Sequence, residues 1–110
     1  MNYITLNLKE NLPTVELALA QFEIELERAK EAGIKLIKII HGYGSSGQGG
    51  KICLELRVKL EKMKRNKQIG NYFLGNDWNL YNDQARKLII DNKVVDNFPN
   101  ANPGITIVVV

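Results

Sequence analysis

The sequence predicts an α/β fold, a two-layer α/β sandwich whose four-stranded mixed sheet carries its helices mainly on one face. Two observations predict it. Apolar residues alternate with polar ones, or run without interruption, in short segments bounded by glycine and turn-forming residues, as in strands. Between these segments apolar residues recur every three or four positions, as on helices that bury one face. The expected order is β-α-β-α-β-(short α)-β, and 110 residues fit a single domain, 1–110.

The first half of the chain is expected to form a βαβ unit. A strand over 2–8 alternates polar and apolar residues. In the helix that follows, Pro13 suits the first turn, and Gly33 is typical of the position just after the last turn. The apolar stripe of this helix comprises Val15, Ala18, Leu19, Phe22, Leu26 and Ala29. A second strand over 35–41 is apolar on both faces, which predicts a central position in the sheet and a right-handed crossover.

The second half carries one clear helix and several weaker signals. The helix is expected over 49–65, with Cys53 as a core residue beside its apolar stripe. That stripe comprises Ile52, Leu56, Leu60 and Met63. A third strand is expected over 68–74, a short helix over 83–92, and a last strand over the β-branched run 105–110. The inward residues of the short helix should be Ala85, Leu88 and Ile89.

Positive charge is concentrated in one segment. Residues 34–67 hold nine basic and two acidic side chains, whereas the segments before and after carry net charges of −3 and −1. The whole chain has a net charge of +3. A localised positive field attracts a polyanion, while the alternative is a lysine-rich helix face that is merely solvated.

The composition excludes several classes of site. One cysteine and one histidine provide neither an internal disulfide nor a four-ligand zinc site, and we expect no metal and no cofactor. The N-terminus lacks the features of a signal peptide, and no apolar stretch reaches the roughly 18 residues of a membrane span. The expected location is therefore the cytoplasm, without membrane contact.

A glycine-rich run between a strand and a helix is the candidate functional site. It reads His-Gly-Tyr-Gly-Ser-Ser-Gly-Gln-Gly-Gly over 41–50. The N-terminal amides of a helix attract an anion, and glycines let the anion approach the backbone closely. Lys51 adds a positive charge at the start of the helix, and His41 ends the preceding strand. We therefore expect the run to bind phosphate groups of a nucleic acid, the alternative being a flexible connection without a ligand.

Two phosphate-binding motifs with similar glycine spacing do not fit. The dinucleotide fingerprint needs an acidic residue at the end of the following strand, about 20 positions on, where this chain has a basic helix. The P-loop needs Ser or Thr after Gly-Lys, whereas Ile52 follows Lys51 here.

The run resembles the core motif of Smr (small MutS-related) domains, in which a His-Gly-x-Gly loop joins a strand to a helix. The segments 12–18 and 104–109 also resemble the family's first helix and last strand, whereas 69–103 matches poorly and is a divergent segment. The chain therefore resembles a stand-alone Smr domain. The resemblance implies an α/β sandwich similar to the C-terminal domain of bacterial translation initiation factor three. It also implies nucleic-acid binding, with DNA nicking or RNA cleavage in some members.

The family members that cleave carry Leu-Asp-x-His-Gly at the end of the first strand. Here Asn7 stands in place of the acid and Lys9 in place of the histidine, so the resemblance favours binding over cleavage. Lys9 still suits a phosphate. The residues expected to bind phosphate are Lys9, His41, Gly42, Gly44, Ser45, Ser46, Gly47, Gln48, Gly49, Gly50, Lys51, Arg57, Lys59, Lys62, Lys64 and Arg65.

Three hypotheses for the function follow. The first is a nucleic-acid-binding domain that contacts the backbone of RNA or DNA. The second is an Smr-type endonuclease in which His41 is catalytic. The third is a protein-interaction module, with the ribosome or repair proteins as partners, because the C-terminal third is rich in aromatic residues. Those residues are Tyr72, Phe73, Trp78, Tyr81 and Phe98, and the alternative is that they fill the core.

Overall fold

The computed structural model describes residues 2–9, 14–42, 48–94 and 102–110, with the side chains of 48 and 49 excepted. The order of elements is the predicted one. Along the chain lie β1 (Tyr3–Asn7), α1 (Val15–Ala32), β2 (Leu36–Ile40), α2 (Gln48–Arg65), β3 (Asn71–Leu74), the 3-10 helix η1 (Gly75–Asp77), α3 (Asp83–Asp91) and β4 (Ile105–Val109). Within the described ranges, no helix is long and apolar enough to cross a membrane.

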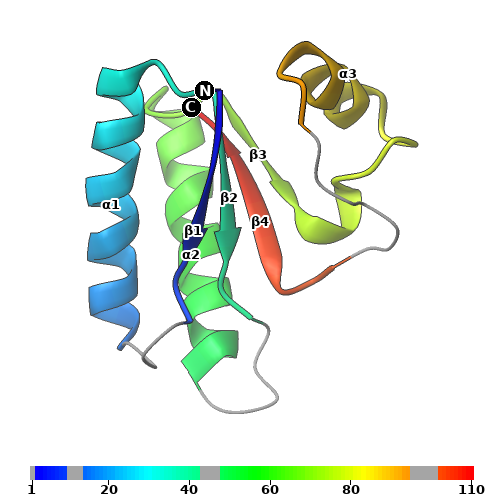
Figure 1. The fold of residues 1–110 in the computed structure, drawn as a ribbon. Coiled ribbons are helices and arrows are strands. Elements are labelled where there is room, and N and C mark those ends of the chain that lie inside the picture. The colour runs from blue at the N-terminus through cyan, green and yellow to red at the C-terminus, as the bar shows by residue number, and fades with distance from the viewer. Residues whose placement is uncertain (1, 10–13, 43–47, 95–101) are drawn as a thin grey trace.

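The four strands form one mixed sheet in the order β1-β2-β4-β3 (Figure 1). β1 pairs in parallel with β2, and β4 runs antiparallel to both of its neighbours. In the register of the sheet, Ile39 lies between Leu6 and Thr106. The α/β class, the mixed four-stranded sheet and the central position of β2 are therefore confirmed.

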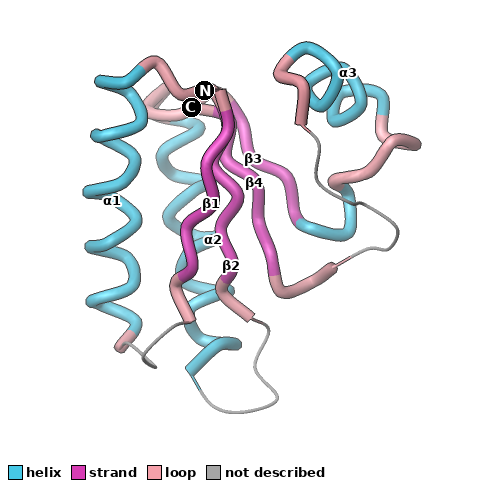
Figure 2. The backbone as a smooth tube through the Cα atoms, viewed as in Figure 1, coloured by secondary structure: helices cyan, strands magenta, loops and turns pink. Residues whose placement is uncertain are grey.

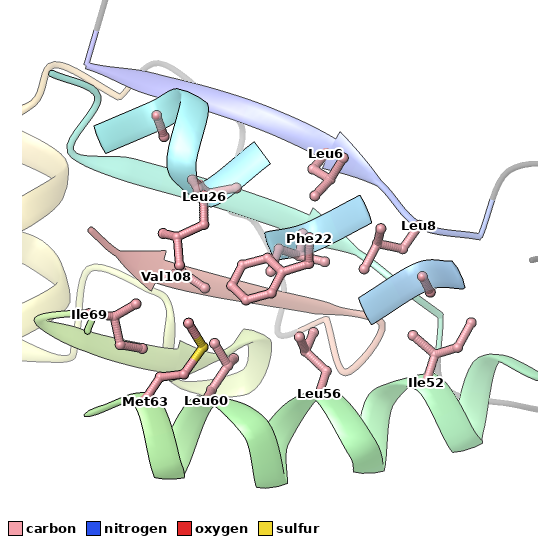
Figure 3. Packing of buried hydrophobic residues seen from close by; sticks show 14 residues of the cluster. Leu6, Leu8, Phe22, Leu26, Ile52, Leu56, Leu60, Met63, Ile69 and Val108 are labelled. Atoms are coloured by element: carbon pink, nitrogen blue, oxygen red, sulfur yellow. The ribbon is translucent and has the colours of Figure 1, made fainter. Parts of the chain in front are cut away.

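Helices α1 and α2 pack on one face of the sheet and enclose the larger core with it (Figure 3). The stripes predicted for the two helices point toward the sheet and toward each other. The fully buried side chains of this core include Phe22, Leu26, Ile52, Leu56 and Leu60. Cys53 is buried too, as expected. Leucine and isoleucine from β1 and β2 close the core on the sheet side, because every second residue of a strand points to the same face.

A smaller apolar cluster lies on the opposite face of the sheet, where α3 packs. Its buried members are Leu36, Phe73, Trp78, Ala85, Ile89 and Ile107. The rings of Phe73 and Trp78 lie with their centroids 5.4 Å apart. Two of the three α-helices thus cover one face, which agrees with the prediction, and the short third helix shields part of the other.

The three α-helices end in the same backbone motif. After each helix one residue adopts a left-handed conformation: Gly33 (φ 72°), Lys67 (φ 61°) and Lys93 (φ 52°). The next residue donates its backbone N–H to the carbonyl five positions earlier, as in Ile34 to Ala29 (2.9 Å) and Gln68 to Met63 (2.8 Å). The prediction for Gly33 is confirmed, and the two lysines hold a conformation that glycine adopts at lower cost.

Both ends of the chain meet at the start of β2 (Figure 2). The Asn2 carbonyl accepts a hydrogen bond from the Lys35 amide (3.0 Å), and the Val110 amide donates to the Lys35 carbonyl (2.9 Å). The termini therefore lie at the edge of the sheet where β2 begins, and the glycine run follows the opposite end of that strand.

Candidate functional site

Two strands end and two helices begin at one edge of the sheet. β1 and β2 are parallel and finish there, and α1 and α2 start from the same side (Figure 2). Asn7 and Thr14 organise the backbone at this edge. The Asn7 side chain accepts a hydrogen bond from the Lys9 amide (3.0 Å), and the Thr14 hydroxyl caps α1 by accepting from the Leu17 amide (3.2 Å). Lys9 itself is exposed.

The centre of the glycine run lies outside the described residues. Of the predicted phosphate-binding residues, Gly44, Ser45, Ser46 and Gly47 lie there. Gln48 and Gly49 are described only as the first residues of α2. The structure fixes what flanks them. Gly42 has a positive φ of 73°, so the chain turns there in a conformation that favours glycine. The amides of His41 and Gly42 both donate to the Gly104 carbonyl (3.0 Å each), which ties the entry of the run to the start of β4.

The His41 side chain is fully buried, and each of its ring nitrogens has a hydrogen-bond partner. Nδ1 contacts the Gly42 carbonyl (2.5 Å), and Nε2 lies 2.8 Å from the Thr106 hydroxyl, which is also buried. A carbonyl can only accept, so we assign the ring proton to Nδ1. Nε2 then accepts from the Thr106 hydroxyl. One imidazole therefore links the end of β2 to both the glycine run and the neighbouring strand.

The surroundings of His41 favour the neutral ring. Burial lowers the pKa of His41, the hydrogen bond to the Gly42 carbonyl opposes that shift, and the positive charge of Arg57 lowers the pKa further. Whether His41 contacts phosphate or transfers a proton stays a prediction. Among the described residues, its ring reaches only partners that hold the backbone in place.

Arg57 is the one basic residue of α2 that the described structure brings near His41. It is half-buried, and its Nε is shielded from solvent without a hydrogen-bond partner. Its charge also bears on Tyr72, although burial and the hydrogen bond to Glu61 dominate there and raise the pKa of the phenol. Arg57 thus lies on the side of α2 that faces β3.

The remaining basic residues of α2 are spread along the helix rather than gathered at the glycine run. Lys51 is exposed in the first turn, whereas Lys62, Lys64 and Arg65 occupy the last turn. A rise of 1.5 Å per residue places these two groups about 20 Å apart. Lys59 pairs with Glu23 of α1 (2.5 Å). A single phosphate cannot contact both groups, whereas a polynucleotide can.

Lys64 and the aromatic residues occupy distinct surroundings. The Lys64 ammonium lies over the Tyr72 ring, 5.9 Å from its centroid. Trp78 belongs to the smaller core, and Tyr81 is 95% exposed. Phe98 lies outside the described residues. In the described part of the chain, no group of three His, Cys, Asp or Glu side chains could hold a metal ion.

Sequence reasoning missed Thr106 and Gly104 as residues of this site. Gly104 supplies the carbonyl that fixes the exit of β2, and Thr106 supplies the hydroxyl that orients the only histidine. A signal for Thr106 was present, because it is the only hydroxyl in the apolar run 105–110. A buried strand seldom carries a hydroxyl without a hydrogen-bond partner.

The sequence matches no protein-family model and none of the curated proteins compared with it. Among solved structures, the fold is similar to that of the Smr domain of MutS2 from Thermus thermophilus, with a TM-score of 0.56. The match covers 99% of this chain and 96% of that domain at 19% sequence identity. The Smr-like fold expected from the glycine run is thereby confirmed, and at this identity the likeness concerns the fold alone.

Proposed function

We propose that this protein binds the backbone of RNA or DNA at the edge where β1 and β2 end and α1 and α2 begin. The observation that carries the proposal is the fixed exit of β2. His41 and Gly42 are locked to Gly104, so the glycine run leaves the sheet at a defined point directly before the N-terminus of α2. Unpaired amides at a helix N-terminus bind anions, and phosphate is the anion that a polynucleotide presents repeatedly.

Charge at the same edge supports this reading. Lys9 and Lys51 are exposed beside the run, and α2 carries six basic and two acidic side chains. Glu16 in the first turn of α1 is the acidic residue nearest in sequence to the Thr14 cap. The binding edge is therefore not uniformly positive, and contacts should come mainly from Lys9, Lys51, Arg57 and the backbone amides of the run. The last turn of α2 contributes chiefly a positive field.

In this proposal His41 has a positioning role rather than a catalytic one. A general acid or base must reach the reacting atoms, and both nitrogens of this ring are buried and engaged. By fixing the peptide after it, the ring sets where the glycine run begins. An Smr-type endonuclease remains the alternative. It requires movement of His41 or a catalytic group other than this residue.

Fluorescence anisotropy with labelled single- and double-stranded RNA and DNA tests the proposal. The double variant Lys9→Ala/Lys51→Ala removes two exposed charges at the binding edge. The matched control Lys87→Ala/Lys93→Ala removes two exposed charges on and after α3. Each phosphate contact contributes about 0.7 to the slope of log K against log salt on a single strand. The first variant should lower this slope by about 1.4, and the control should leave it unchanged.

Two results would contradict the proposal. One is an affinity that stays flat between low and high salt, because phosphate contacts release counterions. The other is equal weakening by both variants, which would indicate a diffuse charge effect rather than a site. Electrophoresis of the same nucleic acids after incubation reports cleavage, and cut products would favour the endonuclease instead.

A further inference from the structure

The outward surface of the two-helix layer carries four exposed apolar side chains. On α1 these are Leu17 (64% exposed) and Ile24 (54%), and on α2 they are Leu54 (63%) and Val58 (60%). With 3.6 residues per turn, each pair falls on the side of its helix opposite the buried stripe. We call this surface the outer helical face. Its end at the first turn of α2, where Lys51 lies, adjoins the edge where β2 ends.

Charged residues on the outer helical face differ in sign between the two helices. Beyond Ile24, α1 presents Glu27 and Glu31, whereas beyond Val58, α2 presents Lys62 and Arg65. Two charges of the opposite sign on these sides are already engaged: Arg28 pairs with Glu25 (2.9 Å), and Glu61 accepts a hydrogen bond from the Tyr72 hydroxyl (2.8 Å). Glu27 makes only a long ion pair with Lys30 (3.8 Å). Glu31, Lys62 and Arg65 form no ion pair with any described residue. Both helices thus display an apolar half followed by a charged half, and the charges are opposite.

The two helices are aligned so that these halves lie at matching heights. Each helix connects two parallel strands of the sheet, so α1 and α2 run in the same direction (Figure 1). The ion pair between Glu23 and Lys59 sets their relative height. Leu54 is then level with the residue after Leu17. By the same offset, Val58 lies within about 3 Å of the height of Ile24 at 1.5 Å per residue.

The charged halves match in the same way. Lys62 is level with the residue before Glu27, and Arg65 lies between the heights of Glu27 and Glu31. The layer has an acidic end on α1, a basic end on α2 and apolar halves at matching heights. It is therefore complementary to a second copy of itself that is turned by 180°.

From this self-complementarity we infer that the outer helical face binds a second copy of this chain in a symmetric dimer. A two-fold axis parallel to the helices places α1 of each copy on α2 of the other. Leu17 and Ile24 then meet Leu54 and Val58 of the second copy, and the two glutamates meet its Lys62 and Arg65. The other face-to-face two-fold axis would set α1 antiparallel on α1 and α2 antiparallel on α2, which brings the charged half of each helix against the apolar half of its counterpart.

A nucleic acid is the competing occupant, and the apolar residues argue against it. Phosphates need positive charge along the whole surface, whereas Leu54 and Val58 occupy its centre on α2, and α1 offers glutamates. In the proposed dimer both glycine runs lie at the same end. Lys51 lies one turn before Leu54 on the same side of α2, so the interface ends next to each candidate binding edge.

The size of the face sets the expected affinity. Two 18-residue helices are each about 27 Å long and lie about 10 Å apart, so the layer covers about 540 Å² per copy. Burying it on both copies removes about 1,100 Å² from solvent, near the lower limit for specific interfaces. Interfaces of this size are typical of weak or transient complexes, so a monomer fraction should persist at low protein concentration.

Sedimentation equilibrium over a wide concentration range tests the dimer. The average mass should rise toward twice the 12.4 kDa of one chain as concentration increases. The variants Glu27→Lys/Glu31→Lys and Lys62→Glu/Arg65→Glu should each weaken self-association at least tenfold, because each opposes like charges. An equimolar mixture of the two should associate again, because both halves of the mixed interface regain opposite charges. Lys87→Glu on α3 is the matched control and should dimerise as the wild type does.

Three outcomes would overturn the inference. The first is a monomer mass at every concentration up to several hundred micromolar. The second is a dimer that withstands both charge reversals, which would place the interface elsewhere. The third is failure of the mixed variants to associate while circular dichroism shows that both are folded. Loss of nucleic-acid binding in Lys62→Glu/Arg65→Glu, in a protein that is always monomeric, would assign the face to nucleic acid instead.

Discussion

Thr106→Val isolates the hydrogen bond that orients the only histidine of the chain. Valine has nearly the shape of threonine and exchanges the hydroxyl for a methyl group. Both partners of the bond are fully buried, so no water replaces the lost donor at His41 Nε2. A buried acceptor left without a partner costs about 1–3 kcal/mol, and the added methyl group returns up to about 0.8 kcal/mol. We expect Thr106→Val to lower the free energy of unfolding by about 1–2 kcal/mol.

A double-mutant cycle with His41→Leu separates this bond from other effects of the substitution. In the leucine background the Thr106 hydroxyl has no imidazole partner, so Thr106→Val should cost nothing or stabilise slightly. Urea denaturation followed by circular dichroism gives the four free energies, and the coupling should be about 1–2 kcal/mol. A coupling below about 0.3 kcal/mol would refute the reasoning, because independent sites add to within that margin.

Three further predictions concern stability. Because burial lowers the pKa of His41 below its ordinary value of 6.5, the folded protein binds fewer protons than the unfolded chain below that pH. The contribution of the neutral His41 to the free energy of unfolding should be fully present above pH 6.5. It should decline as the pH falls toward the folded pKa, by at most about 1.4 kcal/mol per pH unit. Urea titrations between pH 7.5 and 5.5 should show this slope for the wild type and not for His41→Leu. Gly75→Ala should destabilise by about 3 kcal/mol, because its Cβ would lie 1.8 Å from the Asn102 carbonyl oxygen. An unchanged thermal midpoint would show that this backbone contact is absent. Lys67→Gly should stabilise by about 1 kcal/mol, since glycine already holds the equivalent position at Gly33, and a lower midpoint in the same assay would contradict this.

The order of elements could be predicted because the spacing of apolar residues that marks each helix or strand is set by neighbouring residues in the sequence. The alternation in β1, the stripe from Ala18 to Ala29 and the glycine that ends α1 are all properties of neighbouring residues. The apolar character of β2 on both faces also indicated its central position. The packing of α3 on the opposite face could not be predicted. Periodicity shows which side of a helix is apolar but not which surface that side meets.

The candidate site was predictable in its chemistry and not in its geometry. Glycines before a helix indicate an anion site wherever they occur, so the sequence alone identified the run. The position of His41 at a strand end before the run suggested that its side chain contacts phosphate. The buried ring is hydrogen-bonded to Thr106, which is 65 residues away, and contacts at that separation leave no periodic signal. The basic residues in the second half of α2 were assigned to the same site as the run, because the sequence does not show how far along the helix they lie from it.

The meeting of both chain ends at Lys35 has a practical consequence for the study of this protein. Asn2 and Val110 both bond to Lys35, so a peptide that links these two residues would be short, and a circular permutant with new ends in an exposed turn should retain the sheet. A surface anchor or fluorophore attached at either terminus would sit at the edge remote from the exit of β2. Immobilised through that edge, the protein would present the ends of β1 and β2 to the solution, and a ligand could approach them without meeting the support.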